Sequence, residues 1–224
     1  MPLQNRVNPR GQLLADPSRA CLLMGNRGIL HDEHKRIVRS WVGKAWLTCR
    51  LEFGNLKRKE VFRRGSYSEL FFLDEATAFS AGHRPCAYCQ RKRFKRFKEV
   101  WLRANRPAMN EATSINEIDR QLHTERVRRG GEKITYLALL STLPSGTFVE
   151  HAGEAKLWRN GRLQRWSLTG YAAPEIPQNP SQELTVLTPR SVVRMFEAGF
   201  NPGVYGDAHP PDVADHCEAA DRKR

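Results

Sequence analysis

The sequence lacks the features that mark membrane proteins, secreted proteins and disulfide-linked proteins. None of its apolar runs approaches the roughly 18 residues that a membrane-spanning helix needs. The first residues, Met1 to Arg6, lack the apolar segment of a signal peptide. Only five cysteines occur in 224 residues, and in the cytosol these are more often thiols or metal ligands than disulfides. We therefore expect a cytoplasmic protein, nucleoid-associated if bacterial, with no membrane partner.

Sequence features of several common enzyme classes are also missing. The chain shows no internal repeat, no glycine-rich loop that would cradle a phosphate, and no Ser-His-Asp arrangement in a family context. Nucleotide hydrolysis therefore has no support in the sequence. With 40% apolar residues and a mean hydropathy of −0.60, the chain suits one large or two small globular domains.

Positive charge is abundant, but it is confined to the first part of the chain. Residues 1–133 contain 28 Lys and Arg against 14 Asp and Glu, whereas residues 134–224 contain 9 against 10. A basic face of this kind attracts the phosphate backbone of nucleic acid, although an ordinary solvated surface would have the same composition. We expect a nucleic-acid partner, DNA in the first place.

Two cysteines separated by two residues, Cys86 and Cys89, stand between two predicted helices. Asp74 suits a helix N-cap, residues 75–81 favour helix, and Gly82 supplies the left-handed residue that ends it. Two thiolates at this spacing on a tight turn suit tetrahedral Zn²⁺. A redox dithiol or two separate buried thiols are the alternatives, but the βαβ context of a thioredoxin-like site is missing. We expect these cysteines to bind zinc.

The segment FLDEATAFSAGHRPCAYC, residues 72–89, resembles the second half of the metal-binding domain of the Ada alkylation-repair protein. In that domain a helix ends at Ala-Gly, and an aromatic-Arg-Pro sequence leads into Cys-x-x-Cys. This chain has His83 in place of the aromatic residue. Its segment Gly25 to His31 is similar to the opening of some members, in which Gly-Asn and a short gap precede a ligand histidine. The resemblance covers roughly residues 25–91.

The resemblance implies a structural zinc site in which His31 is the third ligand. Cys49, in a predicted strand, would complete a closed Cys3His set consisting of His31, Cys49, Cys86 and Cys89. This assignment assumes an insertion between His31 and Cys49, with Cys21 as the substitute for Cys49. His34 competes with His31, and either histidine could instead be a cap or an ion-pair partner. Because the first metal position of the Ada protein is a methyl-accepting cysteine and here corresponds to His31, we expect no self-methylating repair.

A strongly basic helix is predicted from Gln90 to about Asn105. Phe94, Phe97 and Trp101 recur at helical spacing and form an apolar stripe, which favours core packing over base stacking. Seven Lys and Arg between residues 91 and 103 face a single acid, Glu99. The residues that we expect to contact nucleic acid are those of this helix and one arginine before it: Arg84, Arg91, Lys92, Lys95, Arg96 and Lys98.

A second helix, predicted over residues 115–129, carries the most enzyme-like cluster outside the cysteines. Asp119, His123 and Arg126 fall on one helical face, and Asp119 could orient His123 as a catalytic base. A surface row of ion pairs is the simpler alternative. If the protein is an enzyme, we expect a base-excising DNA glycosylase or a nuclease with Asp119 and His123 as its catalytic residues.

The last part of the chain is predicted to be mainly strands. Segments 135–140, 146–151, 155–159 and 162–167 fit a meander, with Asn160-Gly161 as a type I′ turn that places Trp158 opposite Leu163. A helix follows over residues 188–198. The predicted class is therefore α+β, a small zinc-stabilised N-terminal α/β module followed by an antiparallel β-meander with a closing helix. The predicted divisions are an N-terminal arm (1–20), an Ada-like zinc module with the basic helix (21–106), a linker and helix (107–133), the meander with its helix (134–206) and a disordered tail (207–224).

These patterns predict a zinc-containing DNA-binding protein of DNA repair or genome maintenance. A DNA-processing enzyme and an RNA-associated or regulatory binding module remain alternatives. The sequence names no substrate base, no strand preference and no oligomeric state.

Overall fold

A computed structural model describes residues 1–54, 60–108 and 112–207 of the chain. Within these residues the chain forms two six-stranded sheets and four α-helices, so the predicted α+β class is confirmed. The helices, together with one short 3₁₀ helix, are α1 (Glu75–Ser80), α2 (Arg91–Asn105), α3 (Ile115–Arg126), η1 (Leu140–Thr142) and α4 (Arg190–Glu197).

The first sheet is mixed and has the strand order β2-β1-β5-β3-β4-β6. Its β1–β5 and β4–β6 pairs are parallel, whereas its other pairs are antiparallel. Its strands are β1 (Gln4–Val7), β2 (Leu13–Ala15), β3 (Leu23–Asn26), β4 (Leu47–Arg50), β5 (Leu70–Phe72) and β6 (Arg84–Pro85).

The expected irregular arm over residues 1–20 is wrong, because β1 and β2 belong to this sheet. Val7 pairs with Phe72 of β5 and is almost fully buried. Burial of Val7 against Leu30, Leu70 and Phe72 stabilises a strand that the local sequence does not favour.

The second sheet is antiparallel and has the strand order β11-β10-β9-β8-β12-β7. The predicted hairpin is confirmed: Asn160 and Gly161 have positive φ, and Trp158 lies opposite Leu163. The meander is interrupted, because β12 lies between β7 and β8. The strands are β7 (Tyr136–Leu139), β8 (Thr147–His151), β9 (Glu154–Arg159), β10 (Arg162–Ser167), β11 (Gly170–Tyr171) and β12 (Glu183–Val186).

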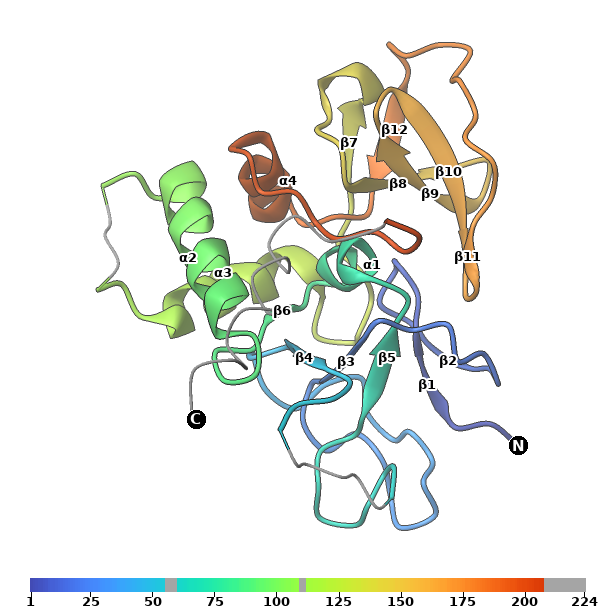
Figure 1. Ribbon diagram of the computed structural model, residues 1–224, viewed down its shortest axis with the longest axis vertical. Helices are drawn as coiled ribbons and strands as arrows, with labels where there is room; N and C mark the ends of the chain where they lie inside the picture. Colours follow the sequence, from blue (N-terminus) through green and yellow to red (C-terminus); the bar gives the residue numbers. More distant parts are fainter. Residues whose placement is uncertain (55–59, 109–111, 208–224) are drawn as a thin grey trace, which may run out of the picture.

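The short helix α1 lies between the two sheets (Figure 1). Asp74 is its N-cap and accepts a hydrogen bond from Thr77 N at 2.8 Å, as predicted. One face of α1 places Ala76 among Phe148 and Leu157 of the second sheet, and another places Ala78 in the core of the first sheet. The helix therefore joins the two layers.

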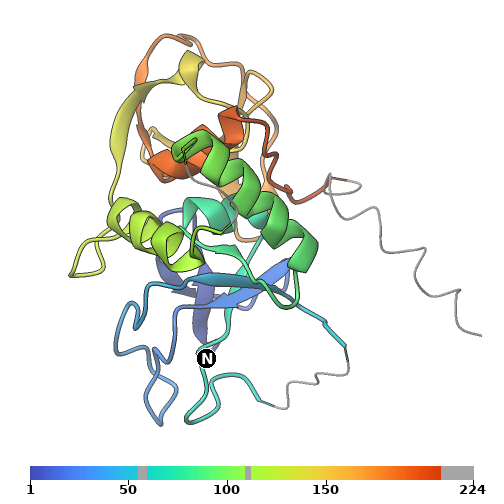
Figure 2. The same cartoon turned by 90° about the vertical axis from the view of Figure 1, so that its left-hand side faces the viewer.

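The other three helices pack around α1 on one side of the molecule, where α2 crosses in front of α4 and above α3 (Figure 2). Phe79 of α1, Trp101 of α2, Leu122 of α3 and Phe196 of α4 share one buried cluster. The predicted core role of the aromatic stripe is confirmed for Phe97 and Trp101, whereas Phe94 is only partly buried. Segments from before and after residue 134 contribute to the same core.

Asp207, at the end of the described chain, accepts a hydrogen bond from Arg159 at 3.0 Å. The rest of the predicted disordered tail lies outside the described residues. In the part of the chain that the structure describes, no helix is both long enough and apolar enough to cross a bilayer.

Candidate metal centre

Three of the predicted ligands converge at one edge of the first sheet. Cys49 lies on β4, Cys86 directly follows β6, and Cys89 lies three residues further, in the turn before α2. The parallel pairing of β4 with β6 brings these positions together, and Cys86 N donates to Thr48 O at 2.9 Å. The sulfur atoms of the three cysteines all lie within 4.8 Å of one another.

This spacing fits a thiolate-bound metal. Three sulfurs at about 2.3 Å from a tetrahedral zinc ion would be roughly 3.8 Å apart, so only a small contraction of the trio is needed. The three cysteines could therefore hold one metal ion. Among the described residues, no further His, Cys, Asp or Glu belongs to this group.

Backbone N–H groups already point at two of the sulfurs. Tyr88 N donates to Cys86 Sγ at 3.4 Å, and the backbone of Arg50 donates to Cys89. Gln90 holds the turn against β4, since its side-chain amide donates to Thr48 O at 2.9 Å. Such N–H···S bonds favour the thiolate, which is the form that binds metal.

The three thiols also perturb one another. The pKa of Cys86 is lowered because its sulfur accepts hydrogen bonds from Cys49 and Cys89. The pKa of Cys49 is raised because its thiol donates to Cys86 and Cys89, and because it is partly buried. The first negative charge of the trio is therefore placed on Cys86, and a divalent cation that replaced the two remaining thiol protons would be bound by three thiolates.

His31, the expected histidine ligand, does not belong to the cysteine group. Its ring is buried, stacks on Phe62 at 4.6 Å between centroids, and places Nδ1 at 2.6 Å from Ser68 Oγ. The alternative His34 lies beside Glu33 at 3.7 Å, and Cys21 is a separate, half-buried thiol. The similarity of residues 25–31 to a segment with a ligand histidine therefore does not place a histidine beside the three cysteines.

The expected catalytic pair, Asp119 and His123, is not formed. Both carboxylate oxygens of Asp119 accept hydrogen bonds from Arg84 at 2.7 Å, in a buried pair. His123 Nδ1 lies at 3.2 Å from Arg126, and its ring edge packs on Trp41. Helical spacing placed the two residues one turn apart, but each has a different partner.

The same contact removes Arg84 from the predicted nucleic-acid-binding set, because its guanidinium is buried against Asp119 and over the ring of Phe94. The remaining members lie on α2. Arg91, Lys92 and Lys95 are exposed there, whereas Arg96 and Lys98 are partly exposed.

Three cations that the sequence did not group together lie close to one another. Arg27 and Arg126 are almost fully buried, and Lys133 lies close to them. Arg27 is about 100 residues from the other two, and of the three only Arg126 belonged to a predicted cluster.

No family model, curated protein or solved structure matches this chain. Fold and site together define an α+β protein with a candidate three-cysteine metal centre.

Proposed function

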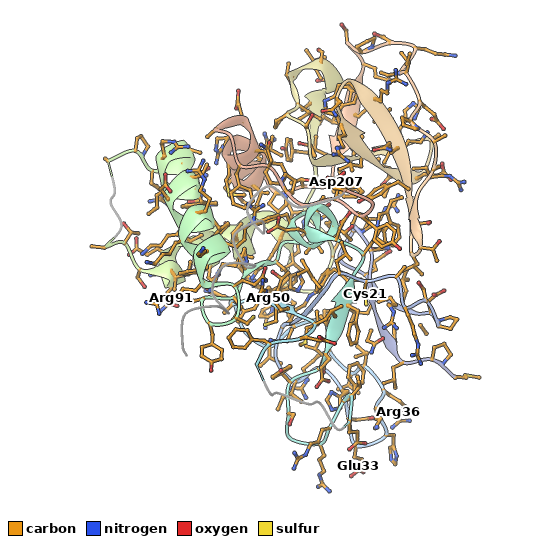
Figure 3. All side chains as sticks on the ribbon, viewed as in Figure 1. Cys21, Glu33, Arg36, Arg50, Arg91 and Asp207 are labelled. Atoms are coloured by element: carbon orange, nitrogen blue, oxygen red, sulfur yellow. The ribbon has the colours of Figure 1, made fainter. Side chains whose placement is uncertain are left out.

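We propose that Cys49, Cys86 and Cys89 bind a structural zinc ion, and that the chain is a zinc-containing DNA-binding protein of DNA repair or genome maintenance. The observation that carries the proposal is the convergence of the three thiols at the start of the basic helix α2. Figure 3 labels Arg50 and Arg91, the last residue of β4 and the first of α2. The metal would hold these two elements together.

The charge distribution supports the nucleic-acid part of this proposal. Arg91 and Lys92 are exposed and are separated from Cys89 by a single residue, Gln90. Lys95 lies about one helical turn after Arg91. A helix fixed at its base by a metal presents these cations in a defined direction, and phosphate contacts of this kind position a protein on nucleic acid. The resemblance of residues 72–89 to the Ada metal-binding domain supports a role in repair.

The metal is tested by measuring the zinc content of the purified protein and of single cysteine variants. We expect about one equivalent of zinc in the parent protein, and its loss with lower stability in Cys49→Ser, Cys86→Ser and Cys89→Ser, because metal binding supplies folding free energy. Cys21→Ser is the matched control, since this thiol lies outside the group. X-ray absorption should show three sulfur ligands. A zinc-free parent protein after reconstitution, or a Cys86→Ser variant that keeps its zinc, would contradict the assignment.

DNA binding is tested with the double variant Arg91→Gln/Lys95→Gln, whose two side chains are exposed on α2. We expect weaker binding to all DNA sequences alike, and a slope of log K against log salt that is reduced by about 0.9 for each lost phosphate contact. The control is Arg128→Gln/Arg162→Gln, which removes two exposed cations elsewhere. Duplex DNA, single-stranded DNA and RNA are compared under identical salt. An unchanged slope in the α2 variant would exclude this face.

A further inference from the structure

A cavity of about 670 Å³ lies beside the β1–β2 hairpin and the end of α3. Its walls come from the β1–β2 hairpin, from the segment around Trp46, and from the chain that follows α3. Arg27, Arg126 and Lys133 all line it. Arg27, directly after β3, and two cations from the end of α3 and the chain after it therefore line one cavity.

The two arginines are built into the wall and not spread over the surface. Arg27 is 3% exposed and Arg126 is 2% exposed. Their guanidinium carbons lie at 4.1 Å and 4.0 Å from the centroid of the Trp46 ring. Cation–π contact and packing thus hold both groups in place before any ligand arrives.

The partners of these cations are neutral. Arg27 donates to Gly11 O at 3.0 Å and to His83 Nε2 at 3.2 Å. Arg126 donates to two backbone carbonyls, the nearer being Gly82 O at 2.6 Å, and its buried Nε has no partner. Lys133 Nζ donates to a backbone carbonyl at 2.6 Å. Within the described ranges, none of the three cations forms an ion pair with a carboxylate.

The nearest acids are already engaged elsewhere. Asp119 attracts Arg126 at longer range, but its two oxygens are occupied by Arg84. Glu132 lines the cavity and lies at 3.5 Å from Arg128.

Unbalanced buried charge is costly, and the ionisation of the cluster reflects this cost. Burial lowers the pKa of Arg27 and of Arg126 to about 9. Burial and the two arginines together lower the pKa of Lys133 to about 7. A negatively charged ligand would offset the cost of burying these charges and the repulsion of Lys133 by the two arginines.

We propose that this cavity is an anion-binding site that receives a phosphate group, held by Arg27, Arg126 and Lys133. A guanidinium fork matches the oxygen geometry of phosphate, and a dianion suits a site with more than one cation better than a single carboxylate does. The volume falls in the range of small-molecule sites, so a nucleotide or the phosphorylated end of a strand would fit as well as the free ion. The proposal requires neither the zinc ion nor the α2 face.

The site is tested by titrating the full-length protein with inorganic phosphate, with AMP, and with a short oligonucleotide with or without a 5′-phosphate, against chloride at matched ionic strength. We expect phosphate, but not chloride, to raise the melting temperature in a saturable way. Tighter binding of the 5′-phosphorylated strand than of its 5′-hydroxyl form would assign the phosphate to a strand end, whereas preference for AMP would assign it to a small nucleotide.

Two variants make the test specific. Lys133→Met removes one charge while keeping an extended side chain, so we expect the ligand-free protein to be at least as stable as the parent and phosphate binding to weaken roughly tenfold or more. Arg27→Gln should show the same loss of binding, and exposed Arg129→Met is the control with parent affinity. The proposal is overturned if phosphate has no effect beyond chloride, or if Lys133→Met and Arg27→Gln bind phosphate as the parent does. Phosphate binding in the cavity does not depend on the α2 face. Loss of DNA binding in Arg91→Gln/Lys95→Gln would therefore leave the phosphate result unaffected.

Discussion

At the residue scale, His83 is a buried histidine that packs among aromatic rings. Its ring centroid lies 4.6 Å from that of Phe72 and 5.2 Å from that of Trp46. Arg27 donates to its Nε2, which fixes the neutral tautomer that carries its proton on Nδ1. Burial, together with the nearby Arg27 and Arg126, lowers the pKa of His83 well below its usual value.

This shift predicts the pH dependence of stability. Between pH 6.5 and about pH 5 the unfolded chain binds a proton at His83 and the folded chain does not. Lowering the pH through this range should therefore reduce the free energy of unfolding by about 1.4 kcal/mol per pH unit. Urea unfolding across this range should show a smaller fall in His83→Gln, which keeps an acceptor for Arg27. Exposed His34→Gln is the control. The pKa of His123 is also lowered, so some pH dependence should remain. An unchanged slope in His83→Gln would show that His83 protonates freely in the folded state.

At the scale of single elements, the junction between α1 and β6 depends on Gly82. Its φ is +87°, and its N–H donates to Phe79 O at 2.9 Å, as expected for the residue that ends a helix. A Cβ at this position would lie 2.8 Å from Arg126 Cβ and still closer to Arg126 Cδ. Arg126 cannot move away easily, because it is buried and bonded to two carbonyls.

We therefore expect Gly82→Ala to destabilise the fold by about 3 kcal/mol, which combines left-handed backbone strain with a clash in a packed site. Gly199→Ala is the matched control: Gly199 also ends a helix with positive φ, but it has open space around it. The control should lose only the backbone contribution, about 1 kcal/mol. Chemical unfolding measures both values, and equal losses in the two variants would rule out the clash.

At the scale of the whole molecule, Asp74 joins the two sheets. Its Oδ1 caps α1, and its Oδ2 accepts from Tyr171 OH at 2.6 Å and from Tyr205 N at 2.9 Å. The carboxyl is fully buried, and burial raises its pKa although Thr77, Tyr171 and Tyr205 donate to it. One side chain thus connects α1 to β11 and to the segment after α4.

Removing one of these bonds should affect both sheets together. Tyr171→Phe leaves the buried carboxylate one donor short, so we expect a loss of about 1–3 kcal/mol. Because the helices share one core, unfolding midpoints from tryptophan fluorescence and from far-ultraviolet circular dichroism should shift by the same amount. Tyr88→Phe, at a largely exposed position, is the control. A shift seen by one probe alone would show that the two sheets unfold separately.

The sequence by itself determined those features that depend on a few neighbouring residues. Asp74 as a cap, Gly82 as a helix end and the Asn160-Gly161 turn were predicted correctly, because each follows from local backbone preferences. The spacing of Cys86 and Cys89 is equally local. For these features, residue type alone was sufficient.

Only the tertiary structure decided which distant residues meet. Parallel pairing of β4 with β6 brings Cys49 to the other two cysteines, while His31 packs against Ser68 and Phe62. Arg84 lies on the first sheet, so Asp119 bonds to it rather than to His123 one helical turn away. Arg27 and Lys133 counted in the sequence only as part of the basic total, and Arg126 was predicted to lie beside His123, not beside Arg27. The convergence of these three cations, like each of these contacts, is set by chain packing over long sequence separations, which local propensity does not encode.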